Sequence, residues 1–174
     1  MKSLRLKILL LGLSLVCFWG CNKTDDGSYT TPITLYEKVG GSWSLKSLKM
    51  VDEFAKANEI KPDEQNLESF FNYQDFKLLL NVDQTMNPTS YKVEGNVPPL
   101  FEPSGYWELS SPFQPTTANA VRIKLYSDAS KSKLTEELRL TSIPGSTSDM
   151  QVQLVRSSEG TAYLSYIFNL TATN

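Results

Sequence analysis

Hydrophobic and polar residues alternate with a period of two along most of the chain beyond Pro32. This period is typical of β-strands that bury one face, and turn residues separate the successive runs. In the first run the alternation changes phase between Leu45 and Leu48, which predicts a β-bulge. The pattern predicts eight strands, over residues 41–51, 75–82, 90–95, 105–110, 120–126, 134–143, 149–156 and 160–173.

Most connections between these runs are short and polar, so we expect sequential strands to pair as an antiparallel meander. Eight such strands can close into a barrel and leave no free edge. The sequence therefore predicts an all-β fold, an eight-stranded antiparallel up-and-down barrel. One connection, residues 52–72, is longer, and Pro62 with Asp63 makes a plausible helix start. We expect one short helix there, covering one end of the barrel, with these residues on its buried face: Leu67, Phe70 and Phe71.

The N-terminal stretch combines three basic residues with an apolar run of 12 residues, from Ile8 to Trp19. A membrane-spanning helix needs about 20 such residues, so the run fits the core of a secretory signal. Gly20 directly precedes Cys21, and this end resembles a bacterial lipoprotein signal, in which cleavage leaves a lipidated cysteine at the new N-terminus. An ordinary signal peptide cut elsewhere is the alternative. Cys17 follows Val16 instead of a small residue such as Gly20, so cleavage before Cys17 fits the lipoprotein signal less well.

The residues after Cys21 are polar and carry the acidic pair Asp25 and Asp26. They predict a flexible tether, and they resemble the export signal of surface lipoproteins in the Bacteroides group; a plain solvated linker is the alternative. The predicted organisation is a signal peptide over residues 1–20, a lipidated cysteine and tether over 21–36, and a barrel domain over 37–174. We therefore expect a lipid-anchored protein of the outer membrane, exposed at the cell surface, with the lipid bilayer as a partner.

Composition narrows the chemistry that the protein can perform. Histidine is absent, which excludes Ser-His-Asp, Cys-His and histidine-metal sites. Without the three basic residues of the signal, 14 basic residues face 19 acidic ones, a formal charge of −5, so binding of nucleic acid through phosphates is not expected. The glycines form no phosphate-binding loop and no calcium-binding loop is present. We expect no cofactor and no metal.

Two short motifs carry a family resemblance. Gly41-Ser42-Trp43 in the first predicted strand, followed by a long connection and a run of hairpins, resembles a lipocalin. The resemblance implies that Trp43 packs at the closed end of the barrel. A second motif, Gly105-Tyr106-Trp107, is similar to the lipocalin-like domain families of unknown function found in Bacteroides-group lipoproteins. The resemblance covers about residues 37–171, lacks the later lipocalin motifs and disulfides, and implies no ligand.

Carboxylate pairs are the remaining candidates for catalysis, because glycoside hydrolysis uses two acids, one with a raised pKa. The sequence has three adjacent pairs: Asp52-Glu53, Asp63-Glu64 and Glu136-Glu137. Neighbours on a strand point to opposite faces, so we interpret these pairs as ordinary surface charges. A Ser-x-x-K match at residues 130–133 lies in a polar turn and lacks its companion motifs. We therefore expect no catalytic residues.

A segment rich in proline and aromatic residues gives the candidate binding residues. Six of the nine prolines lie between Pro88 and Pro115. Aromatic rings on stiff loops can stack on sugars or apolar ligands; alternatively, Trp107 fills the core and the other rings cap the rim. The candidate ligand-binding residues are Phe70, Phe71, Phe101, Tyr106, Trp107 and Phe113.

Together these features predict a membrane-anchored, non-catalytic binding module for a small apolar ligand or a glycan. One alternative is an adhesin or assembly protein, in which the strands form a β-sandwich. Another is a hydrolase that uses two carboxylates. A core filled by large side chains would argue against a small ligand inside the barrel, whereas two facing carboxylates, one with a raised pKa, would favour the hydrolase.

Overall fold

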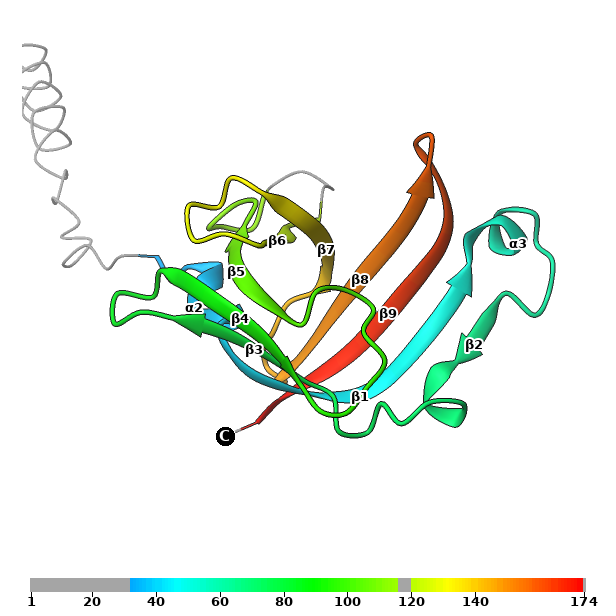
Figure 1. Ribbon diagram of the computed structural model, residues 1–174, viewed down its shortest axis with the longest axis horizontal. Coiled ribbons are helices and arrows are strands. Elements are labelled where there is room, and N and C mark those ends of the chain that lie inside the picture. Colours follow the sequence, from blue (N-terminus) through cyan, green and yellow to red (C-terminus); the bar gives the residue numbers. More distant parts are fainter. Residues whose placement is uncertain (1–31, 116–119, 174) are drawn as a thin grey trace, which may run out of the picture. The chain divides into compact units, whose positions relative to one another are not determined.

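A computed structural model describes residues 32–115 and 120–173, and the chain from Ile33 onward forms one compact unit (Figure 1). Its strands form one antiparallel sheet in sequence order, and the sheet closes because β1 also pairs with β9. The predicted barrel and all eight of its strands are confirmed. The strands of the barrel are β1 (Gly41–Asp52), β3 (Lys77–Val82), β4 (Pro88–Glu94), β5 (Ser104–Leu109), β6 (Arg122–Tyr126), β7 (Leu134–Ser142), β8 (Asp149–Ser158) and β9 (Thr161–Thr173).

Strands β8, β9 and β1 are the longest and run side by side through the molecule (Figure 1). The register of β1 against β9 shifts between Leu45 and Ser47, which confirms the predicted bulge. Alternate residues of most barrel strands point inward and fill the core. The largest fully buried side chains include Trp107, Tyr91, Phe168, Leu48, Leu78, Leu80, Ile123 and Met150.

The long connection after β1 contains a short helix, as predicted, but at a different position. Its helix is α3 (Glu53–Ala57), which begins directly after β1 because the Asp52 carboxylate accepts the Ala55 N–H at 2.8 Å. The predicted helix start at Pro62 is wrong. Strand β2 (Glu64–Asn66) pairs there with the second half of β1, beyond the part of β1 that β3 covers. The open edge of β1 thus overrides the local helix signal.

A one-turn 3-10 helix, η1 (Leu67–Ser69), follows β2. Leu67 is buried, whereas Phe70 and Phe71 are exposed, so these three residues do not share a buried face.

An additional helix, α2 (Leu35–Val39), precedes the first strand and buries Leu35 and Val39. Thr34 donates its backbone N–H to Glu37 Oε1 at 3.0 Å. This T-x-x-E spacing is a helix-start signal that the sequence carries. The folded unit therefore includes residues 33–36, ahead of the domain start expected at residue 37. No helix of the described ranges is long and apolar enough to cross a membrane.

Candidate functional site

The two ends of the barrel are covered in different ways. The end where β1 begins, here called the closed end, is covered by α2. The Trp43 Nε1–H donates to Val39 O of that helix at 2.8 Å, as the lipocalin resemblance implies for this tryptophan. The Tyr36 ring packs edge-on against Trp107, with the ring centroids 5.8 Å apart. Trp107 in turn donates to Asn81 O at 2.8 Å. The closed end is therefore part of the hydrophobic core.

The opposite end, here called the open end, is covered by the irregular connection between β4 and β5, residues 95–103, which we name the lid loop (Figure 1). Three side chains from outside the loop donate hydrogen bonds to its backbone carbonyls, one from the connection before β3 and two from barrel strands. Tyr73 Oη donates to Pro98 O at 3.2 Å, and Tyr91 Oη donates to Glu102 O at 3.1 Å. Arg156 Nη2 donates to Leu100 O at 2.6 Å.

Arg156 also forms an ion pair with Glu136. The position of Arg156 on β8 explains why its side chain reaches the lid loop. Met150, Val152 and Leu154 point inward, and Arg156 continues the same alternation at the open end. Its guanidinium therefore lies between the barrel wall and the lid loop. The alternation along β8 was the only sequence signal for this residue.

A small apolar cavity lies beneath the lid loop. Its volume is about 60 Å³. This is about the space of two water molecules and well below the roughly 300 Å³ of a usual ligand pocket. A ligand could be enclosed here only if the lid loop moved. The lining residues include Tyr73, Phe76, Val93, Val97, Leu100 and Phe101.

The lid loop begins at a glycine for a steric reason. Gly95 has φ of +103°, and a Cβ added to it would lie 2.3 Å from Asp75 O. Residues with a side chain rarely adopt this conformation, and the carbonyl leaves no space for one. Gly95 therefore fixes where β4 ends and the lid loop starts.

The structure brings only some of the predicted binding residues together. Phe71 packs edge-on against Tyr73, with the centroids 6.1 Å apart, and Tyr73 lines the same cavity as Phe101. Phe101 also contacts the core residue Phe168, with centroids 6.2 Å apart. Phe70, next in the chain to Phe71, is 64% exposed. Phe71 and Phe101 thus share the open end.

The other three candidates lie elsewhere. Trp107 is completely buried in the core, which agrees with the alternative interpretation of this residue. Tyr106 is half-buried on β5, on the opposite face from Trp107. Phe113 is exposed in the connection after β5, next to Pro112, which accepts the Leu35 N–H of α2. It therefore lies at the closed end.

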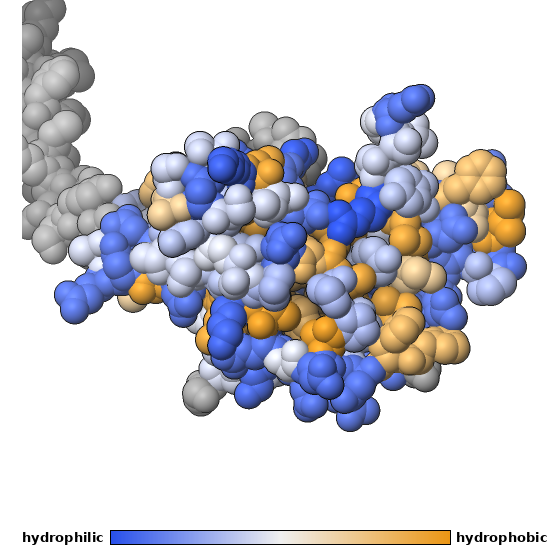
Figure 2. Space-filling model, viewed as in Figure 1, coloured by the Kyte–Doolittle hydropathy of each residue, from blue (hydrophilic) through white to orange (hydrophobic). Residues whose placement is uncertain are grey.

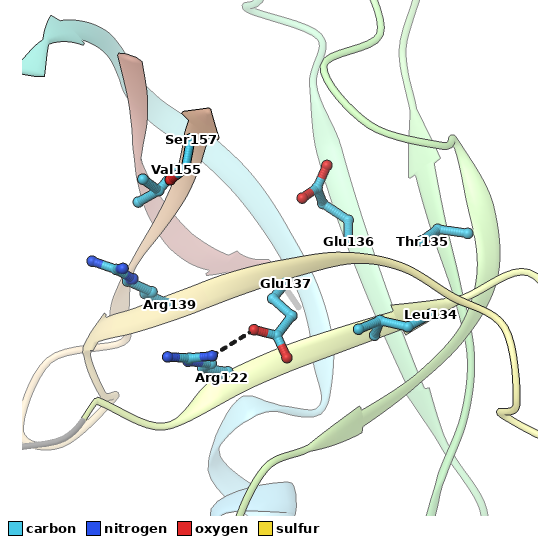
Figure 3. Close-up of a pocket in the computed structure, with 8 residues that line it drawn as sticks. All are labelled: Arg122, Leu134, Thr135, Glu136, Glu137, Arg139, Val155 and Ser157. Carbon is cyan, nitrogen blue, oxygen red and sulfur yellow. Dashed lines mark hydrogen bonds and ion pairs between the residues drawn. The ribbon is translucent and has the colours of Figure 1, made fainter. Parts of the chain in front are cut away.

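A second depression lies where β7 separates from β8 (Figure 3). The two strands pair only from Leu138 opposite Leu154 onward, and a groove of about 350 Å³ occupies the gap. Figure 3 shows Glu136 and Glu137 on opposite sides of β7. Glu137 accepts from Arg122 at 2.7 Å, while Glu136 pairs with Arg156. These two adjacent acids therefore point to opposite faces of β7, as predicted for neighbours on a strand.

The resolved pKa shifts of the described carboxyl groups are all downward. The Lys61 ammonium lowers the pKa of Asp63, and Lys46 lowers that of Asp149. The Thr85 hydroxyl and the backbone N–H groups of residues 85 and 87 lower the pKa of Asp83 to about 2. A general acid needs a raised pKa instead. Within residues 32–115 and 120–173 no three His, Cys, Asp or Glu side chains gather as metal ligands.

Residues 1–31 lie outside the described residues, and with them the predicted signal peptide over 1–20, Cys21 and most of the predicted tether over 21–36. Comparisons with known proteins add a family but no activity. No curated protein and no solved structure matches the chain. The lipocalin resemblance therefore depends on the barrel architecture and on the Gly-x-Trp residues alone. One family model matches residues 19–171, which is most of the sequence. The chain belongs to the family described as Domain of unknown function (DUF5004).

Proposed function

We propose that this protein is a membrane-anchored, non-catalytic binding module that takes up a small apolar ligand beneath the lid loop. The observation that carries the proposal is the difference between the two barrel ends. A helix packed into the core covers the closed end, whereas an irregular loop covers the open end over a small apolar cavity. The exposed ring of Phe71 and the partly buried ring of Phe101 flank the position where a ligand would enter.

Moving the lid loop would break three side-chain hydrogen bonds and the packing of Val97, Leu100 and Phe101 against the core. Each of its three side-chain hydrogen bonds contributes roughly 0.5–1.5 kcal/mol, and the bond from the charged Arg156 up to about 3 kcal/mol. Burying about 200 Å² of apolar surface on a ligand contributes about 5 kcal/mol in return. A ligand that also covers the apolar side chains of the lid loop would offset the cost of opening it. A glycan fits this site less well, because the cavity lining is apolar.

The alternatives from the sequence have less support. The strands close into a barrel through the pairing of β1 with β9, so the β-sandwich form of the adhesin alternative is wrong. The hydrolase would need two carboxylates that face each other. The opposite orientation of Glu136 and Glu137, together with the lowered carboxyl pKa values, supports a non-catalytic role instead.

The anchor is the second part of the proposal. Lipidation of Cys21 would hold the protein at the outer membrane, and the acidic tether would direct it to the cell surface. Cys21→Ala should abolish labelling by a fatty-acid probe and release the protein from membranes, whereas Cys17→Ala should leave both unchanged. Retained labelling of the Cys21 variant would contradict lipidation at this residue.

Ligand uptake is tested by titrating the protein with the fluorescent apolar probe 8-anilinonaphthalene-1-sulfonate and competing it with fatty acids of 8 to 16 carbons. We expect saturable binding that the competitors displace. Val97→Phe fills the cavity beneath the lid loop and should weaken probe binding at least tenfold. The matched control is Val155→Phe in the groove between β7 and β8, which should bind normally. Equal binding by both variants would overturn the proposed site.

A further inference from the structure

A row of polar side chains crosses four strands on the outer face of the barrel wall. Asn169 of β9 donates through Nδ2 to Ser47 Oγ of β1 at 2.7 Å. Gln151 of β8 donates through Nε2 to Asn169 Oδ1 at 2.7 Å. Thr141 Oγ1 of β7 donates to Gln151 Oε1 at 2.8 Å. Each amide is thus held in one orientation by its neighbours, and we name these four residues the polar row.

Three residues of the polar row, Ser47, Gln151 and Asn169, line a groove of about 390 Å³. Two β-bulges border this part of the wall, one in β1 between Leu45 and Ser47 and one in β7 between Leu140 and Ser142. Bulges bend a strand and re-aim its side chains, which accounts for the hollow in this part of the wall. The volume lies within the range of about 300–1,000 Å³ that small-molecule sites occupy.

Groups in the groove retain unused hydrogen-bonding capacity. A side-chain amide has two N–H donors, and the Gln151 and Asn169 amides each use one within the row. At the edge of the groove Lys46 Nζ donates to Asp149 Oδ2 at 3.0 Å, which leaves further donors on the ammonium and lone pairs on the carboxylate. The groove thus offers both donors and acceptors in fixed positions.

We infer that this groove binds a neutral saccharide. Sugar hydroxyls both donate and accept hydrogen bonds, which matches the mixed donors and acceptors of the polar row. Lys46 and Asp149 neutralise each other, so the groove gives no preference for a charged ligand. This site is separate from the lid loop: it lies on the outer face of the wall, and it does not depend on the proposed uptake of an apolar ligand.

The test uses the full-length protein in detergent with ¹⁵N labelling, and a panel of neutral probes: glucose, galactose, mannose, N-acetylglucosamine, maltose and cellobiose. We expect at least one of them to shift the side-chain amide resonances of Gln151 and Asn169 saturably, while the backbone amides of the lid loop stay in place. Failure of every probe to shift these two amides at 100 mM would overturn the inference. So would tighter binding of a sulfated or phosphorylated sugar than of its neutral parent.

Variants separate a binding site from a structural hydrogen-bond row. Asn169→Ala should weaken saccharide binding at least tenfold, and the control Gln65→Ala on β2 should leave it unchanged. If Asn169→Ala does not fold, Lys46→Met at the exposed edge should give a weaker loss of at least threefold. Unchanged affinity in a folded Asn169→Ala protein, or in Lys46→Met where the former does not fold, would overturn the site. Binding of the apolar probe is measured in parallel and should be unaffected by all three variants.

Discussion

The two ends of this barrel have the same wall but different covers. At the closed end, two tryptophans donate their indole N–H groups to backbone carbonyls, and Leu35 and Val39 of α2 join the core. At the open end, the cover is a loop whose carbonyls accept hydrogen bonds from three side chains outside it, and whose apolar side chains are only partly buried against the core. A cover that belongs to the core opens only with the whole fold, whereas a partly buried loop can open locally.

The difference assigns distinct roles to the aromatic residues. Trp43 and Trp107 stabilise the fold, and neither offers a ring to a ligand at the surface. Phe70 and Phe71 at the open end are exposed and contribute little to stability. Substitutions at the two ends should therefore separate loss of stability from loss of ligand binding.

The largest effect is expected from Trp107→Ala at the core of the closed end. Removing this fully buried ring should lower the free energy of unfolding by about 3–5 kcal/mol, because it leaves a cavity and removes the indole hydrogen bond to Asn81 O. The measurement is urea denaturation followed by circular dichroism. Phe113→Ala, on an exposed ring near the same end, is the control and should stay within about 0.5 kcal/mol of wild type. A loss below about 1 kcal/mol for Trp107→Ala would contradict its role.

Gly95→Ala should have the next largest effect, of about 2 kcal/mol, because the positive φ and the Asp75 carbonyl leave no place for a methyl group. Its damage should be local, with faster hydrogen exchange in the lid loop than in α2. Gly145→Ala is the matched control, because a Cβ there meets nothing within 4 Å. Equal stability of the two variants would show that the lid loop does not need its glycine.

Tyr91→Phe should lower the free energy of unfolding by about 0.5–1.5 kcal/mol, since it removes a single hydrogen bond to the lid loop. The exposed Tyr163 gives the control Tyr163→Phe, with no expected change. Thermal unfolding measures stability, and the fluorescent probe measures uptake. We expect Tyr91→Phe to bind the probe faster, because the lid loop opens more easily. Slower binding would indicate that the lid loop is not the entrance.

The smallest effect is a pH dependence at the closed end, in the turn between β3 and β4. The pKa of Asp83 is lowered to about 2 by the Thr85 hydroxyl and the backbone N–H groups of Thr85 and Asn87. A lowered pKa in the folded state stabilises the fold above the ordinary value of 3.8, and this contribution is lost as the pH falls from 3.8 through about 2. Asp83→Asn should flatten the dependence of stability on pH in that window. An unchanged slope would contradict the assignment.

The sequence predicts the barrel wall well and its covers poorly. Period-two alternation locates all eight strands and the bulge near Leu45, because the pattern is set by which face each residue buries. The helix expected at Pro62 is absent because the edge of β1 pairs with residues 64–66. The local sequence around Pro62 does not include the β1 residues that make this contact. The α2 helix had a local signal in Thr34 and Glu37.

The candidate site likewise has residues that the sequence predicts and contacts that it does not. Phe71 and Phe101 could be selected from composition, and both lie at the open end. The hydrogen bonds that hold the lid loop join Tyr73 to Pro98 and Arg156 to Leu100, across 25 and 56 residues. Such pairs depend on how the strands register around the barrel, so a single sequence does not contain them.

The most direct test of the account is backbone amide hydrogen exchange at the two ends, with and without dodecanoate. We expect the amides of Asn96, Val97 and Leu100 to exchange through local opening, at least about a hundredfold faster than those of α2, because the lid loop is only partly buried against the core whereas α2 belongs to it. Dodecanoate should slow exchange in the lid loop and leave α2 unchanged. Equal exchange at both ends, with no protection of the lid loop by any fatty acid of the panel, would contradict the account.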